Sequence, residues 1–449
     1  MMNKPANLPF IKVLPPGPEA KKVLAKDKRY ITPSYARAYP LVAEKGYGIM
    51  VEDPDGNRYM DLNAGVAVCA TGHCHPEIVR AIQKQSERLI HMIGTDFYYR
   101  WQSDIAEELT KITPGKFAKK VFLANTGAES VEAAIKLARY ITRRPRMIAF
   151  IGAFHGRTMG ALSLTASKAA QRRHFSPLLS EVTHIPFPYC YRCIFNLTYP
   201  KCNFACLSYL EDIIFTKVSP PEDVAAIIIE PIQGEGGYVV APDGYLQRLK
   251  KLACKYGILL VCDEIQSGMG RTGKMFAVEH WKVEPDIICI AKGIASGMPL
   301  SAMVSRASLQ KWTPGSHANT FGGNPVCCAA ALKTIELLKE SLVENARITG
   351  DYLIKRLKSL QNKYDFIGDV RGKGLMVGIE IVKDRKTKTK DPERRNNIVY
   401  NCFRKGILLV GCGENNIRFS PPLIITKNDI DIALEIFEKV LKGKKEYPK

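Results

Sequence analysis

Short apolar runs alternate with amphipathic segments through the middle of the chain. Runs such as AAIIIEPI, ILLVCDEI and DIICIAK have the length of buried strands, whereas VEAAIKLARYI and YLQRLKKLACKY repeat apolar residues at helical spacing. This alternation predicts a mostly parallel sheet that is covered by helices.

The two ends of the chain follow a different pattern. Near the start, GIMVEDPDGNRYMDL predicts two short strands joined by a turn at Asp55-Gly56, and a helix should follow from about Pro76 to Leu89. After Pro325 a long helical stretch leads to VRGKGLMVGIEIV and to a further strand and helix. The opening strands have no place in the central sheet, so we expect a small discontinuous α+β domain from residues 1–72 and 326–449, around a large domain at 73–325.

Composition narrows the class of protein. The 449 residues are 46% hydrophobic, which is enough for a large core and more than one domain. Prolines interrupt the first residues, and no apolar run approaches the roughly 18 residues of a membrane span, so we expect a cytosolic protein without a membrane partner. A net charge of +21 favours anionic partners. The dense basic run at 383–390 lacks the aromatic residues of a nucleic-acid platform, and we expect it to be solvated surface.

Four of the 13 cysteines form a pattern of their own. Cys190, Cys193, Cys202 and Cys206 have the spacing C-x2-C-x8-C-x3-C, which suits free thiols, two disulfides or a structural zinc ion. We expect no catalytic role for them and no metal at the active site.

One glycine pattern is misleading. Residues 268–274, GMGRTGK, match both a dinucleotide fingerprint and the start of a P-loop. A P-loop needs Ser or Thr where this chain has Met275, and a dinucleotide loop must follow its strand directly, whereas five residues intervene here. We therefore do not expect a nucleotide-binding enzyme.

Those intervening residues begin with a carboxylate at the end of a buried strand. Asp263 would be costly to desolvate there without a cation or proton donor as a partner, although a helix N-cap is an alternative role. The next strand ends on Lys292, at the same edge of the predicted sheet, where ligands of open α/β sheets bind. An amine in a partly desolvated pocket has a lowered pKa and can form a Schiff base, whereas a snorkelling lysine is the plainer alternative.

The segments around both residues resemble a known family. DEIQSGMGRTG at 263–273 and IAKGIASGMP at 290–299 are similar to the paired signature of the class III (omega) aminotransferases, which include 4-aminobutyrate and ornithine aminotransferases. The resemblance runs from about Tyr47 to Thr426. It implies fold type I with a mostly parallel seven-stranded sheet, pyridoxal 5'-phosphate as cofactor, Lys292 as the Schiff-base residue, Asp263 against the pyridine nitrogen, and Gln266 on the ring hydroxyl side.

Further cofactor residues follow from the same resemblance. Gly127 and Ala128, at the predicted start of a helix, correspond to the phosphate cup, and a helix N-terminus suits an anion. The ring of Phe154 would stack on the cofactor, and Glu230, which opens EPIQGEGG, belongs to the same site. Thr320 in HANTFGGNP would reach the phosphate of a neighbouring subunit, which implies a homodimer or a dimer-based higher oligomer.

Amino-acid substrates carry a carboxylate, for which a bidentate arginine is the natural partner. The resemblance assigns Arg418 to an α-carboxylate and Arg157 to the carboxylate of ω-amino substrates, although Arg418 could also form a surface ion pair on an edge strand. Glu235 would pair with Arg418 and release it when an α-carboxylate arrives. Asp96 would hold a distal ammonium group, or lie on an exposed loop.

These assignments predict an aminotransferase. It would move an amino group from an ω-amino or diamino acid, of the ornithine or 4-aminobutyrate type, to a 2-oxo acid such as 2-oxoglutarate. The same residues would serve an amino-acid racemase or epimerase, because the two reactions differ in the carbon that receives a proton. A cofactor-free binding protein is the third alternative, and the intact Lys292, Asp263 and Gln266 argue against it.

Overall fold

A central sheet organises the larger part of the molecule in the computed structural model, which describes residues 8–443. The sheet has seven strands, and β12 runs antiparallel to both of its neighbours while the other pairs are parallel, which confirms the expected mostly parallel sheet. In order across the sheet the strands are β4 (Lys119–Ala124), β12 (Ser301–Arg306), β11 (Ile287–Ile290), β10 (Leu259–Asp263), β7 (Val224–Ile229), β5 (Arg146–Phe150) and β6 (Val182–Ile185).

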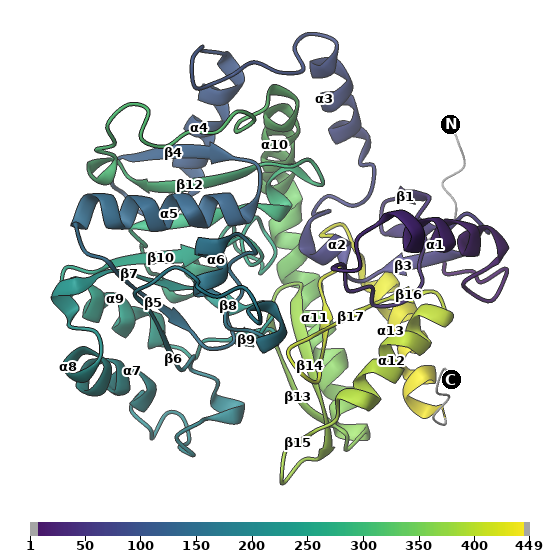
Figure 1. Cartoon of the computed structure of the whole chain (residues 1–449). Coiled ribbons are helices and arrows are strands. Elements are labelled where there is room, and N and C mark those ends of the chain that lie inside the picture. The colour runs from purple at the N-terminus through teal and green to yellow at the C-terminus, as the bar shows by residue number, and fades with distance from the viewer. Residues whose placement is uncertain (1–7, 444–449) are drawn as a thin grey trace.

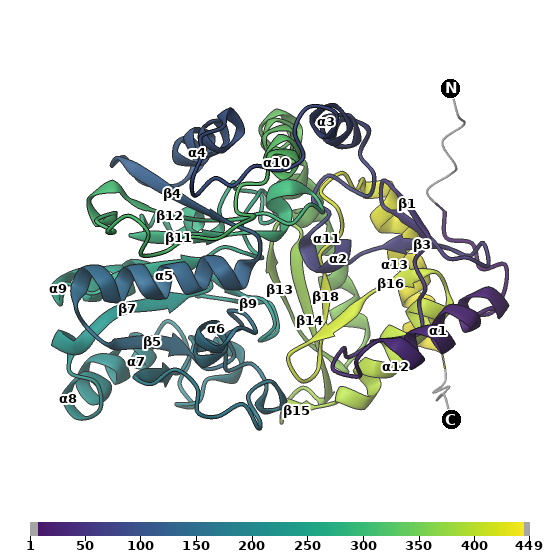
Figure 2. The same cartoon turned by 45° about the horizontal axis from the view of Figure 1, so that its top comes forward.

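Both faces of this sheet are buried. Every residue of β7 is buried, and successive residues enter two separate cores: Ala226 and Ile228 lie in the cluster with α5 (Gly127–Thr142), whereas Ile227 and Ile229 lie in the larger cluster on the other face, together with residues of α9 (Tyr245–Lys255). This two-sided burial explains why the strand sequences are continuously apolar rather than alternating. Figures 1 and 2 show α5 lying along one face of the sheet.

Three further helices lie beside the edge of the sheet that β4 forms (Figure 2). They are α3 (Pro76–Ser86), α4 (Arg100–Ile112) and α10 (Pro325–Leu337). The end of α3 was predicted at Leu89, but the helix stops three residues earlier. The side-chain amide of Gln85 donates to the Leu89 carbonyl oxygen at 3.0 Å, so this chain segment is held in a turn.

The two ends of the chain meet in the second part of the molecule. The antiparallel pair β2 (Met50–Glu52) and β3 (Arg58–Asp61) forms where the sequence predicts it, and β3 pairs in parallel with β16 (Ile407–Leu408). The strand β1 (Lys45–Tyr47) completes this sheet. Because strands from both ends share one sheet, the smaller α+β unit is discontinuous, whereas the proposed domain boundaries at 72 and 325 stay a prediction.

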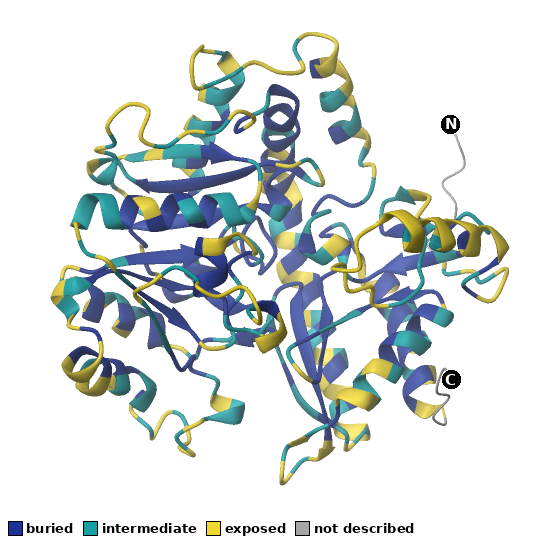
Figure 3. Ribbon diagram, viewed as in Figure 1, coloured by how far each residue is buried: buried dark blue, intermediate teal, exposed yellow. Residues whose placement is uncertain are grey.

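A second sheet of this part presents residues toward the larger part. Its path is β13 (Ile367–Lys373), β14 (Met376–Asp384), β18 (Asn416–Phe419) and β17 (Val410–Cys412), and β15 (Thr389–Lys390) pairs with β14. The helices of the unit are α1 (Pro18–Tyr30), α11 (Val343–Lys363), α12 (Pro392–Arg404) and α13 (Lys427–Lys442). Figure 3 shows the strands of both parts largely buried, with exposed residues on the outer helices and loops.

Two surface expectations can be compared with this fold. The basic run at 383–390 lies at the end of β14 and in the turn to β15, and most of its residues are exposed or half-buried. Among residues 8–443 no helix combines the length and the apolar character that crossing a membrane would need.

The four-cysteine segment folds into a compact turn and helix start. Cys190, Cys193, Cys202 and Cys206 line one small hollow with Phe187 and Phe204, and all four are free thiols. Burial is the main reason why the pKa of Cys206 rises to about 12. Within residues 8–443 no three His, Cys, Asp or Glu side chains are arranged to hold a metal ion.

Candidate active site

A cavity of about 600 Å³ opens where the central strands β10 and β11 end. It brings together most of the residues that the sequence singled out, although they come from loops far apart along the chain. Its lining includes Gly127, Ala128, Phe154, Arg157, Glu230, Glu235, Asp263, Gln266 and Lys292. This is the edge at which open α/β sheets bind ligands.

Lys292 follows β11 after a single residue and has an unusual backbone conformation. Its φ of 47° lies in the left-handed region, which costs a non-glycine residue about 1–3 kcal/mol and is typical of functional sites. Burial lowers the pKa of its ammonium group to about 8, although the charge of Asp263 opposes that shift. A substantial fraction of this amine is therefore neutral near physiological pH, which a nucleophile requires.

Asp263 has a protein partner that the sequence analysis missed. Its Oδ2 lies 2.7 Å from Nδ1 of His155, and its Oδ1 accepts a hydrogen bond from the Ile265 amide at 3.0 Å. Burial alone would lower the pKa of His155, but the hydrogen bond and charge of Asp263 raise it overall. The sequence did hold a signal for this contact, because Asp263 was expected to need a proton donor and His155 is next to the predicted Phe154.

The start of α5 forms the floor of a potential anion site. The Thr126 hydroxyl oxygen caps the helix by accepting a hydrogen bond from the Glu129 amide at 3.3 Å, and Gly127 and Ala128 form the first turn. A Cβ at Gly127 would lie 2.9 Å from the Ile265 side chain, so the close packing favours glycine there. The unpaired amides and the dipole of the 16-residue helix favour a phosphate at this end.

Glu230 ties two loops of the cavity together. One carboxylate oxygen accepts a hydrogen bond from the Phe154 amide and the other from the Gly234 amide, each at 3.0 Å. Burial raises the pKa of Glu230 to about 7. Its geometry is that of a loop anchor, which fixes the positions of the Phe154 ring and of the segment that carries Glu235.

The cavity fits pyridoxal 5'-phosphate in its donors and acceptors. The buried Oε1 atom of Gln266 has no hydrogen-bond partner within the described structure, and the cavity also offers a carboxylate at Asp263 and a partly neutral amine at Lys292. With the helix N-terminus at Gly127 and the half-buried ring of Phe154, these groups suit a phosphorylated aromatic aldehyde.

An ion pair lies beside the cavity. Nη1 of Arg418 is 3.3 Å from Oε2 of Glu235, and Nζ of Lys168, which the sequence analysis did not select, is 2.6 Å from Oε1 of the same carboxylate. The interpretation of Arg418 as a surface residue on an edge strand is wrong. Arg418 is 7% exposed, and β18 is paired on both sides by β14 and β17.

Three predicted substrate or cofactor residues have less support in this chain. Arg157 is exposed, and its guanidinium lies 5.4 Å from the centre of the Phe154 ring at the cavity wall. Asp96 and Thr320 are also exposed and do not line the cavity, but their segments are adjacent because the Thr95 hydroxyl donates to the Asn319 carbonyl oxygen at 3.2 Å. The roles of all three stay predictions.

The misleading glycine pattern is packed inside the molecule. Within residues 268–274, Arg271 is 2% exposed and donates to the carbonyl oxygens of Leu375 and Pro421. A Cβ at Gly273 would lie 2.8 Å from the backbone of Arg347. The segment therefore joins the two parts of the molecule rather than forming a nucleotide loop.

Comparison with known proteins agrees with this geometry. The family model described as aminotransferase class III matches residues 31–441. The chain is 42% identical to the alanine/serine racemase of Pyrococcus horikoshii, over 97% of this chain and 93% of that protein. It is 40% identical to the acetylornithine aminotransferase of Methanosarcina mazei, over 93% of this chain and 95% of that protein.

A solved structure gives the same assignment. The (S)-enantioselective omega-transaminase from Thermomicrobium roseum superposes with a TM-score of 0.87 at 34% identity, over 94% of this chain and 98% of that one. Since both the family model and the relatives cover nearly the whole chain, this protein belongs to the class III aminotransferases, a family of pyridoxal-phosphate-dependent enzymes of fold type I.

Proposed function

We propose that the protein transfers an amino group from an ω-amino or diamino acid, of the ornithine or 4-aminobutyrate type, to a 2-oxo acid such as 2-oxoglutarate. The observation that carries this proposal is the pair formed by Glu235 and Arg418 at 3.3 Å. While Arg418 is paired with Glu235, its charge is compensated, and the site suits a substrate without an α-carboxylate. Once Glu235 moves away, the guanidinium is free to bind an α-carboxylate in a bidentate manner.

Each cavity residue has a distinct part in this proposal. Pyridoxal phosphate, when bound, supplies an aldehyde that condenses with amines and a ring that accepts electrons from the substrate carbon. Lys292 Nζ holds the cofactor and then moves a proton as a general base and acid, for which a pKa of about 8 is suitable. Asp263, oriented by His155, would hold a proton on the ring nitrogen, and Gln266 would bind the ring hydroxyl.

The remaining residues bind and orient. The first-turn amides at Gly127 and Ala128 receive the phosphate, and the Phe154 ring, which Glu230 positions, packs on the cofactor. Arg157 is proposed to bind the far carboxylate of an ω-amino substrate. Asp96, on an exposed loop, is proposed to hold a distal ammonium group.

We also propose a homodimer, in which Thr320 contacts the cofactor phosphate of the partner subunit. The segments around Thr320 expose large apolar side chains, a pattern that marks interaction surfaces. Asn324 joins them by donating to the Ile90 carbonyl oxygen at 2.8 Å. The exposed apolar residues of this patch are Ile90, Met92, Phe97, Tyr98 and Phe321.

Racemisation is the second candidate. It is favoured by the 42% identity to an alanine/serine racemase, and it would use Lys292 and Asp263 in the same positions. In that reaction the proton returns to the substrate carbon from the opposite face, and no 2-oxo acid is consumed.

One experiment separates the two candidates. The holoenzyme is incubated with a panel of L-amino acids and ω-amines, with and without 2-oxoglutarate, while glutamate formation and substrate chirality are followed. Glutamate that depends on the oxo acid supports the aminotransferase and identifies the donor. Loss of optical purity without an oxo acid would replace it by the racemase. An absorbance spectrum that Lys292→Ala leaves unaltered would remove the assignment of Lys292 in either case.

A further inference from the structure

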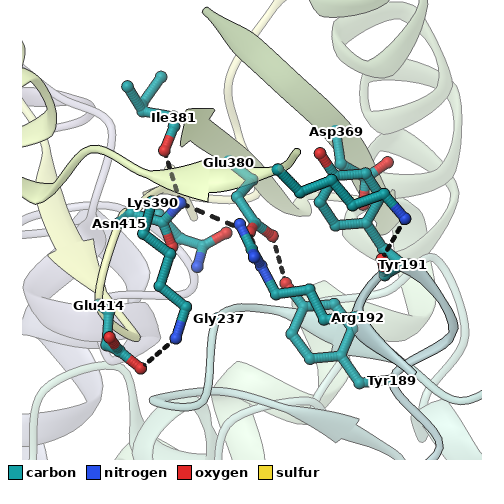
Figure 4. A network of polar contacts seen from close by, with 12 residues as sticks. Tyr189, Tyr191, Arg192, Gly237, Asp369, Glu380, Ile381, Lys390, Glu414 and Asn415 are labelled. Carbon is teal, nitrogen blue, oxygen red and sulfur yellow. Dashed lines mark hydrogen bonds and ion pairs between the residues drawn. The ribbon is translucent and has the colours of Figure 1, made fainter. Parts of the chain in front are cut away.

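A buried cluster of polar side chains joins the turn that carries Glu235 to the sheet that carries Arg418. Glu235 lies between the short strands β8 (Ile232–Gln233) and β9 (Val239–Val240). The cluster is centred on Arg371 in β13 and Glu380 in β14. Figure 4 shows Tyr189 and Arg192 reaching toward Glu380, with Gly237 of the turn close by.

Arg371 uses every N–H group that a guanidinium has, and two of its contacts hold the turn. Nη2 donates to the Gly237 carbonyl oxygen at 2.6 Å and Nε to that of Tyr238 at 3.2 Å. The other three N–H groups donate to side chains of the second sheet: Asn416 at 2.7 Å, Asp369 at 2.8 Å and Glu380 at 2.9 Å. A lysine has three donors on one atom and cannot span these partners.

Glu380 gives the cluster a fixed charge. Its side chain is fully buried, and it accepts hydrogen bonds from the Tyr189 hydroxyl and from Nε of Arg192 as well as from Arg371. Burial alone would raise the pKa of Glu380, but the charge of Arg371 and the other donors lower it overall. The carboxylate therefore stays ionised, and the charge of Arg371 stays compensated, throughout the neutral range.

The turn is also held on its other side. The Glu235 carbonyl oxygen accepts a hydrogen bond from the Gly413 amide at 2.6 Å, and the Gly234 amide donates to Glu230 at 3.0 Å. With the backbone fixed before and after Glu235, its side chain has a short, defined reach to Arg418.

We propose that Arg371 is a positioning residue for substrate selection: by holding the Gly237 and Tyr238 carbonyl groups, it keeps Glu235 on Arg418 and so sets how readily a substrate carboxylate takes that place. This inference rests on the proposed binding of a carboxylate by Arg418. It adds a residue that touches neither cofactor nor substrate.

The test is a double-mutant cycle in the holoenzyme, with glutarate as an unreactive carboxylate and calorimetry as the readout. Arg371→Lys retains a positive charge beside Glu380 but loses the fork to the turn. Glutarate should then bind about two- to fivefold more tightly, because the largely buried pair of Glu235 and Arg418 is loosened but not removed. Glu235→Gln should act in the same direction. Adding Arg371→Lys to Glu235→Gln should then change the affinity no further, because both substitutions act on the same competitor of glutarate, the Glu235 carboxylate on Arg418.

A matched control is Arg385→Lys. Arg385 also donates to backbone carbonyl groups, those of Gln361, Tyr364 and Ile367, but it has no contact with the turn, so glutarate affinity should stay at the wild-type value. If Arg371→Lys does not fold, Asn416→Ala removes one anchor of the same guanidinium and should give a smaller gain in affinity.

Several outcomes decide the matter. If Arg371→Lys weakens glutarate binding by an equal factor with and without Glu235→Gln, Arg371 has a general structural role and the proposal is wrong. The proposal is also wrong if Arg371→Lys leaves glutarate affinity unchanged in both backgrounds. In turnover the KM for the 2-oxo acid should fall and that for the ω-amine should rise, with kcat retained. If the two substitutions are non-additive in glutarate binding but the enzyme transfers no amino group, the proposed reaction is wrong and the role of Arg371 stands. If the enzyme transfers amino groups but the two substitutions are additive, only the role of Arg371 is wrong.

Discussion

At the scale of single residues, Lys292 makes the most direct prediction about pH. Since its pKa is lowered to about 8, covalent incorporation of pyridoxal phosphate into the apoprotein should accelerate about tenfold per pH unit below that value and level off above it, as the neutral amine becomes the main form. Stopped-flow absorbance between pH 6.5 and 9.5 measures the rate. A rate that continues to rise steeply up to pH 9.5 would show an ordinary lysine, and Lys292→Ala should give no product that borohydride can fix.

His155 makes a second prediction at this scale. Its Nδ1 is the side-chain partner of Asp263, so His155→Leu should leave a buried carboxylate without that partner, at a cost of about 3–5 kcal/mol for a broken buried pair. The affinity for pyridoxal phosphate should fall, because His155 no longer holds the Asp263 carboxylate in position. Equilibrium dialysis gives the dissociation constant.

The control for this substitution is the half-buried His280, whereas His155 is fully buried. His280→Leu removes hydrogen bonds to Thr272 but touches no cavity residue, so cofactor affinity should be retained. Equal losses of affinity in both variants would contradict a specific role for His155.

The residue scale also shows what the sequence could and could not reveal. Asp263 and Lys292 were predictable because each lies at the end of its own buried strand, and the ends of parallel strands share an edge of the sheet. His155 was missed because it reaches Asp263 across 108 residues. That contact depends on the order β10-β7-β5 in the sheet, which differs from the order along the chain. Lys168 was missed for a similar reason, since it meets Glu235 across 67 residues.

At the scale of elements, the contact between the loop after β5 and the start of α5 can be tested at Gly156. Its φ is 143°, and a Cβ there would lie 2.8 Å from the Cβ atoms of Ala128 and Ala161, which cannot rotate away. Gly156→Ala should therefore displace the first turn of α5 and cost about 1–3 kcal/mol. Its effect on the affinity for pyridoxal phosphate should be larger than the fall in melting temperature alone would suggest.

Gly315→Ala is the matched control, since Gly315 also has a positive φ, of 83°, but no atom within 4 Å of the added methyl group. It should change stability slightly and cofactor affinity not at all. Dialysis with pyridoxal phosphate and thermal unfolding of both variants separate backbone strain from displacement of the helix. Unaltered affinity in Gly156→Ala would contradict the proposed phosphate site.

Elements were predicted well where apolar periodicity was strong. The strands β7, β10 and β11 and the helix α9 lie where the pattern places them, whereas β6 was not predicted. The helix α5 begins four residues before the apolar segment that indicated it, because Thr126 caps a first turn that lacks large apolar residues. The helices α1 and α4 were not predicted. The cluster around Arg371 and Glu380 was also missed, because it forms only when β13, β14 and the turn at Glu235 meet in space.

At the scale of the whole molecule, the fold class and a small domain built from both chain ends followed from pattern and resemblance, whereas the pairing of β3 with β16 is known only from the structure. The resemblance also predicts a dimer, but the surface that forms it was not predictable, because a self-complementary surface leaves no periodic signal. The surface proposed for the dimer is the apolar patch around Ile90 and Phe321, which lies against the segment of Thr320. A dimer through this patch would bury side chains that are costly to leave in water.

The dimer is therefore the last prediction. Ile90→Asp should place a charge in the buried interface, shift the protein from dimer to monomer in sedimentation velocity at micromolar concentration, and weaken cofactor binding, since Thr320 would no longer reach the partner's phosphate. Ile213→Asp is the control, because Ile213 is also exposed, at 44%, but lies outside the patch. A wild-type monomer, or a dimer that Ile90→Asp leaves intact, would contradict an interface at this patch and leave Thr320 without its proposed role.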